Sequence, residues 1–131
     1  MIVYSSRTGN CRHIANTLGL RSVEIEDGLL VSEPFFLLTY TDKLGEAPET
    51  VLKFMNNNKE HCKGVIASGN TNFGIMNFCG SADTIKRLYS VPVIRKMELR
   101  GSSKDFEHIK EEYKKLIRKG WLHWKNSWRW T

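Results

Sequence analysis

Residues 33–40, EPFFLLTY, form an almost unbroken apolar run of strand length. A strand with one face in water alternates apolar and polar side chains, whereas a strand in a parallel sheet is covered by helices on both faces and is apolar throughout. Residues 63–69, KGVIASG, form a second run of the same kind. Two such runs predict a parallel sheet between layers of helices.

The remaining segments predict the other elements of this α/β fold. Further strands are predicted at residues 1–4, 21–26 and 91–99, and helical spacing of apolar residues predicts helices at residues 10–19, 47–57, 79–89 and 103–119. Strand and helix alternate along the chain apart from one pair of consecutive strands. Parallel strands joined by helical crossovers form an open α/β sheet.

Composition limits the classes of function. The chain has 131 residues and a net charge of +6, which favours an anionic ligand or partner. Its three cysteines lie far apart, without a C-x-x-C motif or histidines at ligand spacing, which argues against a zinc site or a disulfide framework. No apolar run has the length of a bilayer span, and the first residues lack a signal-peptide core. We therefore expect a cytoplasmic protein with no metal ligands.

Three loops follow the predicted strands and are expected at the carboxyl edge of the sheet, where ligands of such folds bind. They are SSRTGN (5–10), TYTDKLGEAP (39–48) and SGNTNFGIMNF (68–78). The first matches neither a nucleoside-triphosphate P-loop nor a dinucleotide fingerprint. Its hydroxyls and the following helix N-terminus favour a phosphate, although an ordinary capped turn would have similar residues. The other two loops combine Gly, Asn and Thr with isolated aromatics, which suits a flat ring.

A phosphate beside a planar ring indicates a mononucleotide-like cofactor, and family resemblance makes this specific. SSRTGN resembles the FMN-phosphate loop of flavodoxins. VSEPFFLLTYT, GEAPETVLKFMNNN, KGVIASGNTNFG and VPVIRKMELRGS resemble NrdI, the flavodoxin-like activator of class Ib ribonucleotide reductase, and the likeness runs from residue 2 to residue 116. The resemblance implies a flavodoxin-like three-layer sandwich with an open five-stranded parallel sheet of strand order 2-1-3-4-5.

The resemblance also implies a function. The family binds FMN, reduces dioxygen with the flavin hydroquinone, and passes superoxide or a peroxide-level oxidant to the dimanganese radical subunit, where a tyrosyl-radical cofactor is assembled. A flavin reductase would supply the electrons. The chemistry would take place on the flavin, so no catalytic side chain is expected. The loops hold Asp42, Glu46 and Glu49, offset by Arg7 and Lys43, and this balance should make the reduced flavin easier to reach.

Matched positions and the loop composition together give the predicted cofactor site. Its residues are Ser5, Ser6, Arg7, Thr8, Gly9, Asn10, Thr39, Tyr40, Thr41, Asp42, Gly45, Ser68, Gly69, Asn70, Asn72, Phe73, Gly74 and Phe78. Two features depart from the family pattern: residues 75–77 lengthen the third loop, and the Trp-rich end has no counterpart. Cys79 follows the third loop, where it is either a redox thiol or, as we expect, a small buried residue.

Two other functions remain open. One is an ordinary flavodoxin that carries electrons between a reductase and an enzyme. The other is a module that binds nucleic acid or a membrane surface through residues 120–131, a Trp-rich basic extension of the flavodoxin-like domain at 1–119. Because Ile117, Trp121, Trp124 and Trp128 continue the apolar stripe of the last helix, we expect that helix to run on. Its tryptophans would then cover the sheet or a neighbouring chain, with no nucleic-acid or membrane partner.

Overall fold

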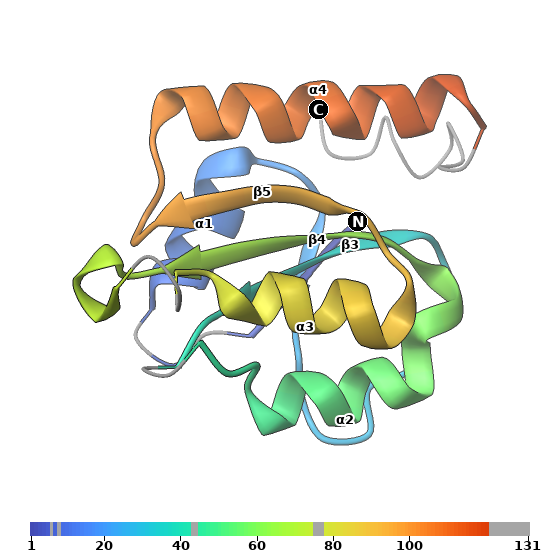
Figure 1. Ribbon diagram of the computed structural model, residues 1–131. Helices are drawn as coiled ribbons and strands as arrows, with labels where there is room; N and C mark the ends of the chain where they lie inside the picture. Colours follow the sequence, from blue (N-terminus) through green and yellow to red (C-terminus); the bar gives the residue numbers. More distant parts are fainter. Residues whose placement is uncertain (6, 8, 43–44, 75–77, 121–131) are drawn as a thin grey trace.

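A five-stranded parallel sheet with strand order β2-β1-β3-β4-β5 forms the middle layer of the protein (Figure 1). The structure is a computed structural model and describes residues 1–5, 7, 9–42, 45–74 and 78–120. The strands are β1 (Ile2–Tyr4), β2 (Ser22–Glu24), β3 (Phe35–Tyr40), β4 (Cys62–Gly69) and β5 (Val93–Glu98). The helices are α1 (Asn10–Leu18), α2 (Glu49–Asn58), α3 (Gly80–Tyr89) and α4 (Ser103–Arg118), with short 3₁₀ turns η1 (Lys59–His61) and η2 (Thr71–Phe73). The predicted three-layer fold and strand order are confirmed.

Helices cover both faces of the sheet, as Figure 1 shows. Side chains of β3 alternate between the two sides: Phe35 and Leu37 pack with α2 and α3, whereas Phe36 and Leu38 pack with α1 and α4. All four side chains are buried. This burial on both faces explains why residues 33–40 are apolar without alternation.

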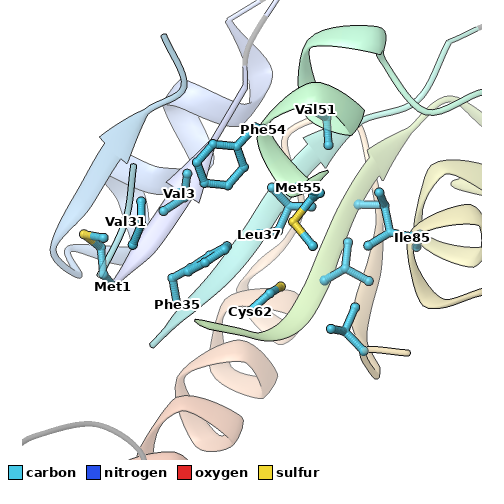
Figure 2. Packing of buried hydrophobic residues seen from close by; sticks show 14 of the residues in the cluster. Met1, Val3, Val31, Phe35, Leu37, Val51, Phe54, Met55, Cys62 and Ile85 are labelled. Atoms are coloured by element: carbon cyan, nitrogen blue, oxygen red, sulfur yellow. The ribbon is translucent and has the colours of Figure 1, made fainter. Parts of the chain in front are cut away.

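The core on the α2 and α3 side is built around aromatic and sulfur-containing side chains (Figure 2). The rings of Phe35 and Phe54 meet edge to face with their centroids 5.6 Å apart. Figure 2 shows Met55 of α2 beside Leu37, and Ile85 of α3 belongs to the same cluster. On the other face, Phe36 makes a similar edge contact with Tyr113 of α4, at 5.6 Å. Both helix layers are therefore anchored on β3.

The structure differs from the sequence prediction at several element ends. β2 is an edge strand of three residues, shorter than the predicted 21–26, and pairs only with β1 among the described strands. Pro48 precedes α2 instead of standing inside its first turn. No described helix is both long enough and apolar enough to cross a membrane.

The last helix does not run on without a break into the tryptophan-rich segment, so that expectation is wrong at the junction. α4 ends at Arg118, and the amide of Gly120 donates to the carbonyl of Ile117 at 3.0 Å. Gly120 has φ +76°, a left-handed conformation that glycine adopts without a Cβ clash and that commonly ends a helix. Residues 121–131 lie outside the described part of the chain, so their proposed packing is untested.

The start of α4 is fixed by a charged side chain. Ser102 and Asp105 form a capping box, and Arg95 Nε of β5 donates to Asp105 Oδ1 at 2.7 Å. Burial acts to raise the pKa of the Asp105 carboxyl, but hydrogen bonds from Arg95 and Ser102 outweigh it and hold the pKa below its ordinary value. The ionised carboxylate therefore stabilises the junction between β5 and α4.

Replacing this carboxylate should give a stability loss that depends on pH. Asp105→Asn should lower the free energy of unfolding by about 1–2 kcal/mol at pH 7, because the cap and a charged hydrogen bond are lost. A lowered folded-state pKa means that this stabilisation is complete above the ordinary aspartate pKa and disappears as the pH falls through the folded value. Urea titrations at pH 7 and at successively lower pH measure the difference between wild type and variant.

Asp83→Asn is the matched control, because Asp83 also pairs with a cation of β5, Lys96 Nζ at 2.8 Å, but is 61% exposed. Its effect should be about 0.5 kcal/mol or less. An Asp105→Asn effect as small as that of the control, or one that does not shrink in acid, would contradict the assigned role.

Candidate functional site

The three predicted loops follow β1, β3 and β4, which are neighbours in the sheet and run parallel. Their carboxyl ends therefore meet at one edge. The described contacts connect the first loop to the second, the second to the start of α3, and the third to the turn between β5 and α4. Of the predicted residues, Ser6 and Thr8 lie outside the described part of the chain, as does the side chain of Phe73.

The first loop leads into the N-terminus of α1. The Ser5 amide donates to the Leu38 carbonyl at 3.2 Å, which holds the loop against β3. Gly9 is the N-cap residue with φ +90°, and no side-chain cap bond forms there among the described residues. The first turn of α1 contains no acidic residue. The positive dipole end of α1 therefore favours an anion.

Arg100, which the sequence prediction missed, also reaches this helix end. Its Nε donates to Asn10 Oδ1 at 3.4 Å from the turn between β5 and α4. Leu99 in that turn has φ +47°, an uncommon conformation for a branched side chain. The Leu99 amide donates to the Gly69 carbonyl at 2.8 Å, and the Ser68 hydroxyl donates to the Leu99 carbonyl. No sequence motif could have revealed this approach, because it depends on the packing of α4 beside α1.

Arg7 joins the first loop to the second. Its guanidinium carbon lies 5.0 Å from the centroid of the Tyr40 ring, and Nη1 lies 2.8 Å from Asp42 Oδ1. That oxygen is buried and has no hydrogen bond in the described structure, so the ion pair supplies charge without hydrogen-bond geometry. Burial and the Asp42 charge raise the pKa of Tyr40, while Arg7 acts in the opposite direction.

The second loop is a tight turn that packs on α3. The Asp42 amide donates to the Glu46 carbonyl at 3.0 Å, and the Gly45 amide donates to the Asp42 carbonyl at 2.9 Å. The Thr41 and Ser81 hydroxyl oxygens are hydrogen-bonded at 2.5 Å. A Cβ at Gly80 would lie 2.5 Å from the Gly45 carbonyl oxygen, so only glycine fits there. These contacts fix the loop that follows Tyr40.

Two predicted site residues use their hydroxyls inside the framework. Thr39 is buried and donates to the Tyr40 carbonyl at 2.9 Å. Ser68 is also buried, and its hydroxyl donates to the Leu99 carbonyl. The structure therefore gives their side chains a supporting role, and a cofactor contact at these positions would come from the main chain. Their assignment to the site stays a prediction.

The third loop is held by β5 and α3. The Thr71 amide and hydroxyl both donate to the Glu98 carboxylate at 3.0 Å. Asn70 Oδ1 accepts from the Asn72 amide at 2.9 Å, which turns the chain into η2. Gly74 follows with φ +92° and has open space where a Cβ would be. Asn70, Asn72 and Gly74 thus line a braced turn at the sheet edge.

The end of this loop enters the core. A Cβ at Gly69 would lie 2.9 Å from Cys79 Sγ, so glycine is required for α3 to begin here. Phe78 is half-buried and packs against the cluster of Figure 2. Cys79 is fully buried, and burial raises the pKa of its thiol to about 12. The prediction of a small buried residue is confirmed.

A cavity of about 490 Å³ lies away from these loops, between residues 25–29 and one side of α2. Its lining includes Asp27, Lys53 and Phe54. The described residues contain no cluster of three or more His, Cys, Asp or Glu side chains that could hold a metal ion. In the described part of the chain, the loop edge combines a helix N-terminus, an aromatic ring and paired charges, and this combination makes it the better candidate.

Comparison with known proteins agrees with the fold. A family model described as NrdI Flavodoxin like matches residues 2–111. Protein NrdI of Bacillus licheniformis is 39% identical over 121 residues, covering 90% of each chain. A short-chain flavodoxin associated with a PDU bacterial microcompartment has a TM-score of 0.70 at 20% identity, over 90% of this chain and 95% of that one. Flavodoxin of Fusobacterium nucleatum, bound to flavin mononucleotide, has a TM-score of 0.63 at 15% identity, with coverages of 90% and 96%.

The contact between Gly80 and Gly45 can be tested without a ligand. Gly80→Ala should displace the second loop, because the new Cβ meets main chain that has no rotamer to change. The expected result is faster hydrogen exchange at the Asp42 and Gly45 amides, measured by NMR. Gly64→Ala is the matched control: its Cβ would lie 2.5 Å from Ile94 Cγ1, a side-chain atom in the sheet. Equal exchange at both amides in wild type and Gly80→Ala would contradict the bracing role.

Proposed function

The chain belongs to the NrdI flavodoxin-like family, and on that basis we propose that it binds FMN and supplies a reduced-oxygen oxidant to the dimanganese radical subunit of a class Ib ribonucleotide reductase. One observation carries the proposal: the N-terminus of α1, the Tyr40 ring and the Arg7–Asp42 ion pair lie at the same edge of the sheet. When bound, FMN would supply the one-electron and dioxygen chemistry. The protein would bind it, set its charge environment and control access to it.

The first loop suits the phosphate of FMN. Gly9 and Asn10 would present main-chain amides at the start of α1, and the helix dipole favours a dianion there. Ser5 would add a polar contact, and the hydroxyls of Ser6 and Thr8 remain predicted ligands outside the described residues. Arg100 lies close enough to Asn10 to add positive charge. No acidic residue of the first turn of α1 opposes the anion.

The second and third loops suit the ring. Tyr40 would cover the ring with its aromatic face, and Thr41, Asp42 and Gly45 would border it from a turn that α3 holds in place. Gly69, Asn70, Asn72 and Gly74 would border it on the β4 side, together with Phe73 and Phe78. Thr71 and Glu98 fix that border through two hydrogen bonds.

The partner proposal rests on the family and on charge. The relative from Bacillus licheniformis bears the name Protein NrdI, and the family resemblance links that name to the radical subunit. A net charge of +6 would favour docking to an acidic surface. A flavin reductase would supply the electrons.

Gly9→Val should weaken FMN binding. Valine at φ +90° is strained, and its branched side chain would crowd the phosphate, so affinity should fall by about 10- to 100-fold for a cost of about 1–3 kcal/mol. Gly19→Val is the matched control, because Gly19 has φ +68°, has no neighbour within 4 Å and ends the same helix. Flavin absorbance and fluorescence titration measure the binding. Full occupancy in Gly9→Val, or equal loss in both variants, would refute the phosphate assignment.

Gly74→Val should separate FMN binding from activation. The strained valine at φ +92° would reshape the third loop while leaving the phosphate loop intact, so FMN affinity should change by less than about threefold. The yield of tyrosyl radical in the manganese-loaded partner, measured by electron paramagnetic resonance, should fall about tenfold, which corresponds to a strain energy of about 1–3 kcal/mol. Gly28→Val, at φ +79° in the loop before β3, is the control.

Unchanged radical yield in Gly74→Val would contradict the role of this loop. A radical that forms equally well without the flavoprotein would overturn the activator proposal. Reversible flavin reduction without oxygen reduction or partner activation would identify the protein as an ordinary flavodoxin.

A further inference from the structure

Arg7 is the one described cation that contacts both an aromatic ring and a carboxylate of the second loop. Its side chain is 59% exposed, yet the guanidinium lies over Tyr40 and against Asp42. An exposed surface ion pair contributes little to stability, so the fold does not depend on this one. What sets this pair apart is the oxygen that it neutralises.

The turn that carries Asp42 is fixed by its main-chain hydrogen bonds. These bonds lie on both sides of the residue, to Glu46 and from Gly45. Oδ1 is shielded from water and accepts no hydrogen bond from the residues that the structure describes. The Asp42 side chain as a whole is 33% exposed, so solvent screens the charge of the carboxylate only in part. Compensation comes from Arg7 Nη1 at 2.8 Å.

The charges of Asp42 and Arg7 both affect the Tyr40 ring. Burial raises the pKa of its hydroxyl, the Asp42 charge raises it further, and Arg7 lowers it. A negative charge forming beside Tyr40 is thus opposed by Asp42 and favoured by Arg7. The same signs apply to a reduced flavin ring bordered by Tyr40 and Asp42.

We propose that Arg7 is a positioning residue for the redox chemistry: by neutralising Asp42 beside the flavin ring, it permits the ring to accept its second electron as an anion. The inference rests on the proposed function and adds the group that regulates it. That step would use one electron from the reductant and no proton, so the bound ring would carry one additional negative charge. Without Arg7, the bare Asp42 carboxylate would oppose that charge. Arg7 also belongs to the phosphate loop. One segment would therefore bind the phosphate and set the charge balance at the flavin ring.

A double-mutant cycle on the full chain reconstituted with FMN tests the pair. Reductive titration with dithionite and reference dyes gives the equilibrium constant of each one-electron step. Arg7→Gln should lower the equilibrium constant of the second one-electron step about tenfold, which corresponds to 59 mV. The reason is that a nearby opposite charge shifts a pKa by about one unit or more. Asp42→Asn should not lower this equilibrium constant. The double variant should return to within about threefold of wild type, since both charges are absent. Arg7→Lys should restore most of the effect.

Arg12→Gln is the matched control. It removes one positive charge from the next exposed arginine of the chain, whose Nη2 lies 2.7 Å from Glu24 instead of Asp42. This variant has the same net charge as Arg7→Gln, so a general electrostatic effect would appear in both. Circular dichroism and thermal unfolding should show that each variant keeps the fold, because both side chains are more than half exposed.

Three outcomes would overturn the inference. An Arg7→Gln value equal to wild type means that the guanidinium does not affect the ring. An equal loss in Arg7→Gln and in the double variant means that Asp42 is not the group that Arg7 neutralises. A wild-type chain that takes up no FMN has no flavin spectrum before any titration, and this separate result would remove the proposed function together with the inference.

Discussion

Strand β3 lies in the middle of the sheet, and neither of its faces meets water. Phe35 and Leu37 contact the helices on one side, while Phe36 and Leu38 contact those on the other. Because the side chains of Phe35 to Leu38 are all apolar, each face of the strand needs a layer of helices. The chain must cross the sheet repeatedly to supply both layers. The order of the strands and the position of the loops depend on this double burial.

The functional edge follows from the same arrangement. Parallel strands bring their carboxyl ends to one side, so three loops that are far apart in the chain become neighbours. Close packing then fixes them. Gly80 admits the Gly45 carbonyl, Gly69 admits Cys79, and Leu99 is held in a left-handed conformation by the third loop. The edge is rigid in its support and polar at its surface, as a site for a charged, flat ligand requires.

Electrostatics distinguishes this edge from a simple acidic one. The first turn of α1 has no carboxylate, and Arg7 and Arg100 approach the second loop and the helix end. The shielded Asp42 oxygen would by itself repel an anion, and Arg7 cancels that repulsion at short range. In the proposed function, such a balance favours a flavin that accepts full reduction and then gives electrons to oxygen.

The sequence by itself determined the α/β class, the alternation of elements, the three loops and, through resemblance, the strand order. Apolar runs and helical spacing are local patterns, and local patterns are set by which faces a segment must bury. It placed Cys79 correctly in the core for the same reason. It also placed Asn10 at the start of α1, because Asn just before an apolar residue pattern of helical spacing is typical of a helix start.

Only the tertiary structure decided which groups meet. Arg100 reaches Asn10 because α4 packs beside α1, and the hydroxyls of Thr39 and Ser68 are used inside the framework because neighbouring main chain lies within reach. The sequence also suggested that the last helix runs on, whereas Gly120 leaves the helical conformation just after Arg118. Contacts between distant segments depend on distances and angles set by packing, and no pattern along one segment encodes them.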